Sequence, residues 1–263
     1  MNIIDIHTHC FPDAVAAKAM AKLTASSAYE VHHNGTLSGL LSAMDSAKID
    51  KAVICSIATK PHQIDKIIDW SRKIKSRRIE PFFSLYPGVE CEETIEKAMS
   101  YNLIGVKMHP QYQNFEANDK FLFSTYAAIE QSGLILTMHS GYDLAYPGDE
   151  KAAPAKMAEI KKNFPKIKLV LAHFGGYRMW QDVLDYVAGK EIYLDTSFIL
   201  RENPEYFYKI IQKHGTDYLL FGTDSPWLSQ QVEKKYLLEA RISDKLKEKI
   251  FFSNAQRLLS SIG

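Results

Sequence analysis

Two histidines near the amino terminus have the type and the spacing of metal ligands. His7 and His9 end an apolar segment in which Ile4 and Ile6 alternate with polar residues. Side chains on a β-strand alternate between two faces, so we expect both imidazoles on one face, together with Asp5. Imidazole is a common ligand of zinc, and core packing alone does not explain such a pair. The pair therefore predicts a metal site where the first strand ends.

Other ionisable residues stand at equivalent places farther along the chain. Each of them closes a short apolar segment that we predict to be a strand: Lys107, His109, His139, His173 and Asp224. Burying charged groups without partners is costly, so core packing would not place so many of them in this way. We expect them to share one site with the first histidine pair. The remaining histidines, in predicted loops and helices, are expected to face solvent: His32, His33, His62 and His214.

Short apolar segments alternate with helical patterns over the whole chain. The predicted strands are residues 1–9, 52–57, 81–86, 103–108, 134–138, 168–172, 192–196 and 218–221, and at least one predicted helix follows each. Alternation of this kind implies a parallel sheet, and eight repeats imply an α/β fold closed into a (β/α)₈ TIM barrel. The active site of such a barrel lies at the carboxyl ends of its strands. An open doubly wound sheet is the alternative, but no glycine-rich phosphate loop follows the first strand.

Length, charge and cysteine content narrow the class of protein. The 263 residues contain no low-complexity linker, so we expect one barrel domain over residues 1–263. The 32 basic and 31 acidic residues give a formal charge of +1, which offers no electrostatic case for binding nucleic acid or a membrane surface. Three scattered cysteines suggest no disulfide framework, and no signal peptide or long apolar run is apparent. A cytoplasmic protein is the simplest expectation.

The motifs, taken in strand order, resemble those of a known family. Asp-Ile-His-Thr-His in the first strand, His139, His173 and Gly-Thr-Asp-Ser-Pro after the eighth strand are similar to the amidohydrolase superfamily. The likeness is greatest to its amidohydrolase-related branch of metal-dependent hydrolases, which also contains decarboxylases of aromatic and muconate-type acids. Segments 40–53 and 249–259 agree with it, so the resemblance covers the whole chain.

The resemblance implies a zinc ion held by His7, His9, His139 and Asp224, with His173 as a nearby acid/base or carbonyl-polarising group. Zinc lowers the pKa of a bound water to about 7. Asp224 would accept that water's proton, and His173 would steady the developing oxyanion. Asp5 would either hold an imidazole from behind or bond to backbone.

Several roles are possible for two residues at the end of the predicted fourth strand. Lys107 stands where binuclear members of the superfamily carry a carboxylated lysine that bridges two metal ions. It would bridge a second metal in that way, hold a substrate carboxylate unmodified, or only extend to the mouth of the barrel. His109 would bind substrate, bind an extra metal, or cap the turn before Pro110.

Loop residues near the predicted mouth are candidates for substrate binding. Tyr142 and Trp227 offer aromatic surface, and Arg178 would clamp a carboxylate or merely carry surface charge at a helix start. The irregular segment 24–35 would be a lid over the site or an ordinary surface loop.

These expectations combine into one function with a close rival. We expect a zinc-dependent hydrolase that activates water to attack a C–N or C–O bond of a small organic substrate. The rival is a metal-dependent decarboxylase of a small aromatic or unsaturated acid, which would be recognised by release of carbon dioxide. A nuclease-type barrel would carry Glu where Lys107 stands, and a barrel that only binds a partner would not need every ligand. A homodimer is left open.

Overall fold

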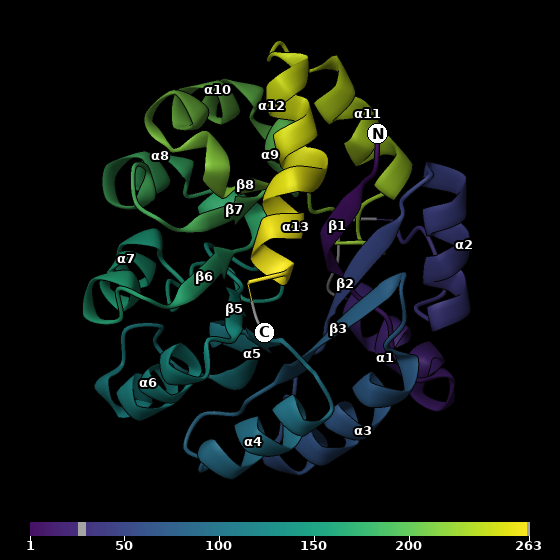
Figure 1. The fold of residues 1–263 in the computed structure, drawn as a ribbon, viewed down its shortest axis with the longest axis vertical. Helices are drawn as coiled ribbons and strands as arrows, with labels where there is room; N and C mark the ends of the chain where they lie inside the picture. The colour runs from purple at the N-terminus through teal and green to yellow at the C-terminus, as the bar shows by residue number, and fades with distance from the viewer. Residues whose placement is uncertain (26–29, 262–263) are drawn as a thin grey trace.

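The computed structural model describes residues 1–25 and 30–261, which form an eight-stranded parallel sheet. The strands pair in chain order from β1 to β8, and helices surround them (Figure 1). All eight lie within or beside the predicted segments: β1 Ile4–Thr8, β2 Lys51–Cys55, β3 Ile79–Ser84, β4 Gly105–Met108, β5 Ile135–Met138, β6 Lys168–Leu171, β7 Tyr193–Asp195 and β8 Leu219–Leu220.

Backbone hydrogen bonds between β1 and the residues that follow β8 close the sheet. The amide of Ile6 donates to the carbonyl of Phe221 at 2.9 Å, and the amide of Asp224 donates to the carbonyl of His7 at 2.8 Å. The predicted (β/α)₈ barrel is thereby confirmed. The second bond also fixes Asp224 beside the strand that carries the histidine pair.

Helices surround the barrel on its outside, and α13 lies across one of its ends (Figure 1). Their bounds are α1 Asp13–Thr24, α2 Leu37–Ala47, α3 Ile64–Ile74, α4 Glu92–Ser100, α5 Pro110–Gln113, α6 Phe123–Ser132, α7 Pro154–Asn163, α8 Trp180–Asp182, α9 Ile199–Glu202, α10 Pro204–Lys213, α11 Gln230–Glu239, α12 Asp244–Glu248 and α13 Asn254–Leu259. Thr36 caps α2, because its hydroxyl accepts a hydrogen bond from the amide of Gly39. Gly133 ends α6 in the left-handed conformation that favours glycine.

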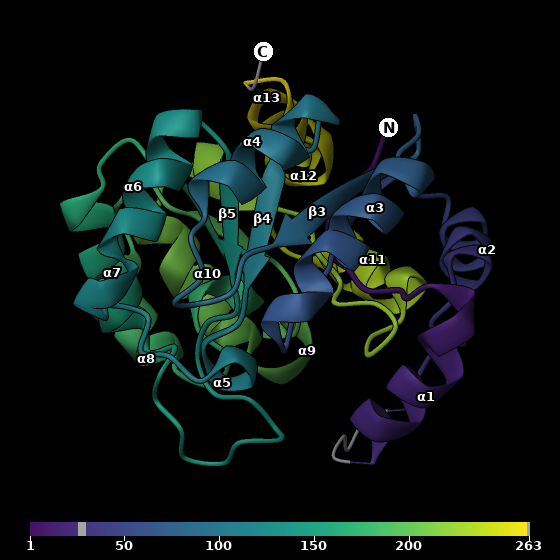
Figure 2. The same cartoon turned by 90° about the horizontal axis from the view of Figure 1, so that it is seen from below.

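Apolar side chains fill the barrel and close its amino-terminal end. An inner cluster contains Ile4, Ile6, Phe82 and Leu220, and Leu258 of α13 packs against them. Figure 2 shows α13 at one end of the barrel and α5, which follows β4, at the other. A larger apolar cluster packs the outer face of the sheet against the surrounding helices. Polar side chains are therefore left to the carboxyl-terminal mouth.

Segment 24–35, for which the sequence left open a lid or an ordinary surface loop, lies partly outside the described residues, which omit 26–29. Within the residues that are described, no helix is both long and apolar enough to cross a membrane.

His214 is buried, so the prediction that it faces solvent is wrong. Its side chain is 3% exposed at the end of α10. Nε2 donates to the carbonyl of Ile192 at 2.9 Å, and Nδ1 accepts from the amide of Gly189 at 3.3 Å. The interior thus holds the neutral imidazole, and burial lowers its pKa from 6.5 to about 4.

This burial predicts a loss of stability in mild acid. The pKa of His214 is lower in the folded chain than in the unfolded chain. The unfolded chain therefore takes up a proton first as the pH falls below 6.5, and the free energy of unfolding decreases until the pH reaches about 4. Over that pH interval, we expect the free energy of unfolding of His214→Gln to decrease by up to about 3 kcal/mol less than that of wild type. Urea unfolding at several pH values measures the difference. His62→Gln, at an exposed histidine, is the control and should follow wild type.

Candidate active site

A β-bulge in β1 turns His7 toward the mouth of the barrel. Between Asp5 and Thr8, β1 carries one residue more than the facing segment of β2. Ile6 packs in the inner apolar cluster and the next residue, His7, lines the main cavity, which strict alternation would not allow. Bulges often re-aim side chains in this way beside active sites. His9 lies two residues farther on and lines the same cavity.

The bulge also separates Asp5 from the imidazoles. Its buried carboxylate accepts hydrogen bonds from the amides of His7 and Thr223, from the Thr223 hydroxyl at 2.6 Å and from Gln230 Nε2 at 2.8 Å. Burial raises the pKa of this carboxyl to about 7. Asp5 therefore links β1 to the loop after β8 and to α11. Of the two roles that the sequence left open for Asp5, the structure shows bonding to backbone.

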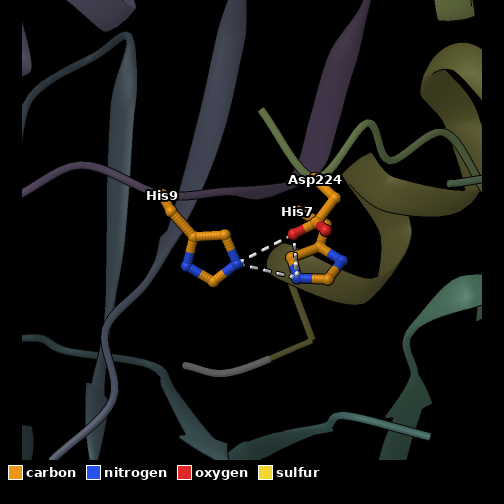
Figure 3. A group of neighbouring side chains, drawn as sticks. All are labelled: His7, His9 and Asp224. Atoms are coloured by element: carbon orange, nitrogen blue, oxygen red, sulfur yellow. Dashed lines mark hydrogen bonds and ion pairs between the residues drawn. The ribbon is translucent and has the colours of Figure 1, made fainter. Parts of the chain in front are cut away.

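Three side chains converge at the mouth. His7 Nε2 lies 3.1 Å from His9 Nε2, and Asp224 Oδ1 lies 3.3 Å from the former and 3.0 Å from the latter. Figure 3 shows the two rings and the carboxylate pointing toward one another. Their ligand atoms lie within 4.8 Å of one another, as the donors of a metal ion would.

Hydrogen bonds on the far side of the ring fix the protonation of His7. Its Nδ1 lies 2.9 Å from the carboxylate of Asp195, an acceptor, so Nδ1 carries the proton. The Nε2 lone pair therefore points at His9 and at an oxygen of Asp224. His9 Nε2 and Lys107 Nζ can both donate to this cluster, the latter at 3.3 Å from His7 Nε2. Imidazole nitrogen and carboxylate oxygen are ligand atoms of divalent metals, so His7, His9 and Asp224 fit a metal ion.

Asp195, at the end of β7, holds two imidazoles in place. One oxygen accepts from His7, and the other accepts from the amide of His173 at 3.1 Å and from the Ser197 hydroxyl at 2.5 Å. The same hydroxyl lies 2.9 Å from Nδ1 of His173. Sequence reasoning missed this network. The signal was present, because Asp195 ends a predicted strand as the other site residues do.

His139 and His173 make a contact between acceptors. Ser197 donates to Asp195, so its oxygen accepts from Nδ1 of His173 and leaves Nε2 unprotonated. His139 Nε2 donates to the carbonyl of Tyr142 at 3.1 Å, which leaves Nδ1 unprotonated. These two bare nitrogens lie 3.1 Å apart. A proton or a cation between them would relieve the contact.

His139 is not part of the compact group formed by His7, His9 and Asp224. Among the described residues it groups with His109 and Asp143 as another candidate set of ligands. Its ring stacks on His109 with centroids 4.0 Å apart. The role of His139 as a fourth ligand stays a prediction.

Burial keeps the site imidazoles in the form that binds metals. It is the main cause that lowers the pKa of His7, His109, His139 and His173 well below 6.5, and the charge of Lys107 adds to the shift of each. Burial also raises the pKa of Asp224. Neutral imidazoles at neutral pH need lose no proton before binding a metal.

Two of the site residues have left-handed backbones. His173 has a φ of 57° and Asp224 has a φ of 58°, a conformation that costs free energy for residues other than glycine. Bonds to neighbouring strands hold both of them, from the His173 amide to Asp195 and from the Asp224 amide to His7. The barrel therefore imposes the direction of these two side chains.

A cavity of about 630 Å³ opens above this cluster and contains most of the predicted substrate-binding residues. Lys107, His109, Tyr142 and Trp227 line it together with the cluster itself. Lys107 is 1% exposed, and its Nζ lies 3.3 Å from His7 Nε2.

Arg178 is not brought into that cavity. Its guanidinium lies against Glu202, with Nε 2.9 Å from Oε2, and the residue lines a separate hollow next to α8. Contact with a ligand at the histidine cluster would require it to leave this ion pair.

Replacing Asp195 is expected to weaken metal binding. Asp195→Asn removes the charge that holds the Nδ1 proton of His7, and loss of such partners costs roughly 10- to 100-fold in metal affinity. Competition with a zinc chelator measures it. Asp185→Asn, at an exposed carboxylate, is the control and should leave zinc affinity near that of wild type. Equal zinc affinity in Asp195→Asn and wild type would contradict the assignment.

Known structures share this fold. A 5-carboxyvanillate decarboxylase from Sphingomonas paucimobilis is 16% identical, with 98% of this chain and 99% of that chain covered and a TM-score of 0.77. A dihydroxybenzoic acid decarboxylase from Polaromonas with bound manganese is 15% identical, with 99% and 97% covered and a TM-score of 0.74. A protein assigned as a 2-pyrone-4,6-dicarboxylic acid hydrolase from Pseudomonas putida is 14% identical, with 98% and 97% covered and a TM-score of 0.71.

No curated protein matches the sequence. A family model described as amidohydrolase matches residues 4–260, which is nearly the whole chain. The protein therefore belongs to the amidohydrolase family, whose members are metal-dependent enzymes that act on small molecules.

Proposed function

We propose that this protein is a zinc-dependent hydrolase that adds water across a C–N or C–O bond of a small organic substrate. The observation that supports this most is the convergence of ligand atoms from His7, His9 and Asp224, which line the cavity within 4.8 Å of one another. Histidine nitrogen and carboxylate oxygen are the ligand types of a catalytic zinc site with room for water or substrate. His139 would be the fourth ligand.

A zinc ion held by these residues would supply Lewis acidity, which lowers the pKa of water and polarises a substrate oxygen. Asp224 accepts a proton from the attacking water and returns it to the leaving nitrogen or oxygen. His173 is the second acid/base group, because its unprotonated Nε2 is free to accept a hydrogen bond from the attacking water while Asp224 takes the proton. Lys107 holds a carboxylate of the substrate.

A decarboxylase is the second candidate. Two of the similar structures are decarboxylases, and the ammonium of Lys107 beside His7 would suit an acid substrate in either reaction. In that case the carboxylate leaves as carbon dioxide, and a proton from Asp224 or His173 replaces it on carbon.

We further propose that the whole chain acts as one catalytic barrel, since the family model spans residues 4–260. The three cysteines are free and buried, which supports a reducing compartment such as the cytoplasm. A homodimer remains part of the proposal from family resemblance alone.

Counting metal ions distinguishes the roles of Lys107. We expect one zinc per chain in wild type and in Lys107→Ala, because an unmodified lysine would not be a ligand. Elemental analysis of protein purified without chelators gives the count. Two ions in wild type, falling to one or none in the variant, would instead make Lys107 a metal bridge, and no metal in either would overturn the mechanism.

Product analysis distinguishes the two reactions. A hydrolase should incorporate oxygen from labelled water into its product without releasing carbon dioxide, and a decarboxylase should do the reverse. Mass spectrometry over a panel of lactones, amides and aromatic acids measures both. We expect Asp224→Asn to reduce turnover by at least about 100-fold, the lower range for general acid–base groups. Asp185→Asn, at an exposed carboxylate, should not reduce it.

A further inference from the structure

The main cavity extends well beyond the histidine cluster, between α1 and α3. Val15, Ala19 and Lys22 line it from α1, and Lys66, Ile67 and Trp70 line it from α3. Residues spaced by three and four share one face of a helix, so each helix presents a single face to the cavity. Figure 2 shows α1 standing out from the barrel on the side of the mouth.

The size of the cavity suits an elongated ligand. Its lining follows the chain from His9 at the cluster to Leu23 near the end of α1. At 1.5 Å per residue, the helical part of that path is roughly 16 Å long. The volume of about 630 Å³ falls within the range of pockets that enclose drug-sized molecules.

The outer part of the cavity is positively charged. Lys18 and Lys22 of α1 and Lys66 of α3 line it, and none of them takes part in the ion pairs formed among the described residues. The acidic residues that line the cavity, within the described part of the chain, are Asp143 and Asp224, both beside the histidines. An anion in this part of the cavity would therefore meet three lysines and, among the described lining residues, no carboxylate away from the histidines.

Apolar side chains line the same part of the cavity as these lysines. Val15 is 48% exposed on α1, and Ala19, Leu23, Ile67 and Trp70 line the same stretch. Covering this surface would be favourable for a hydrocarbon chain or a ring. A second copy of the protein on a two-fold axis would bring the same lysines against each other, which their charges oppose.

We propose that the substrate is an elongated organic anion with an apolar middle. Its reacting end lies at the histidine cluster, its middle lies between α1 and α3, and a second anionic group lies against Lys18, Lys22 and Lys66. This inference rests on the proposed function, because it takes the histidine cluster as the reacting end.

Binding of simple acids to the zinc-loaded protein tests the proposal without turnover. The probes are four- and ten-carbon straight-chain dicarboxylic acids and the ten-carbon monocarboxylic acid, measured by calorimetry at low salt. The ten-carbon diacid is expected to bind about tenfold more tightly than the monoacid, because its second carboxylate reaches the lysines.

Matched lysine variants identify the charges responsible. The triple variant Lys18→Met, Lys22→Met, Lys66→Met should abolish the advantage of the long diacid. The triple variant Lys73→Met, Lys190→Met, Lys245→Met removes equal charge from exposed lysines outside the cavity and should retain it. Both should bind the four-carbon diacid as wild type does, since that ligand reaches only the cluster.

Each failure has its own signature. Equal affinity of the ten-carbon diacid and monoacid in wild type, with the four-carbon diacid bound, overturns the elongated substrate but not the proposed function. Absence of zinc, or no binding of the four-carbon diacid, overturns the proposed function itself. Dissociation of an oligomer in the first triple variant alone would make the groove an interface between copies and would overturn this inference.

Discussion

Close contacts between buried imidazole nitrogens and a carboxylate oxygen constrain the rest of this site. His7 Nε2 faces His9 and Asp224, and the unprotonated Nδ1 of His139 faces the unprotonated Nε2 of His173 at 3.1 Å. The lone pairs of His139 and His173 repel each other because water is out of reach, so their contact is unfavourable unless a proton or a cation lies between the two nitrogens. The strands can hold it because backbone bonds and the apolar core fix each strand end independently of the site.

Asp195 joins parts of the site that are far apart in sequence. Its carboxylate holds His7 of β1 directly and holds His173, after β6, through a backbone amide and Ser197. The proposed metal ligand and the proposed acid/base group therefore share one support. Both imidazoles are neutral because burial lowers their pKa, and the shared carboxylate decides which nitrogen of each is free.

Different parts of the cavity would carry the reaction and the recognition of the substrate. Strand ends supply the histidine cluster, whereas the faces of α1 and α3 supply the long apolar and cationic part. Similar barrels include decarboxylases and a protein assigned as a hydrolase, so the barrel alone does not choose the reaction. In this protein the helices at the mouth offer the features that would select a substrate, since their side chains are not needed to hold the barrel together.

The sequence by itself determined the barrel and the residues gathered at its mouth. Apolar periodicity is local, so it located eight strands, and it placed His7, His139 and Asp224 where strands end. Tertiary structure alone decided the partners. The bulge in β1 depends on pairing with β2 and contradicts strict alternation, and Arg178 pairs with Glu202 from another element. Burial of imidazoles, the Asp195 network and the groove between α1 and α3 likewise arise from contacts between distant segments, which no local pattern records.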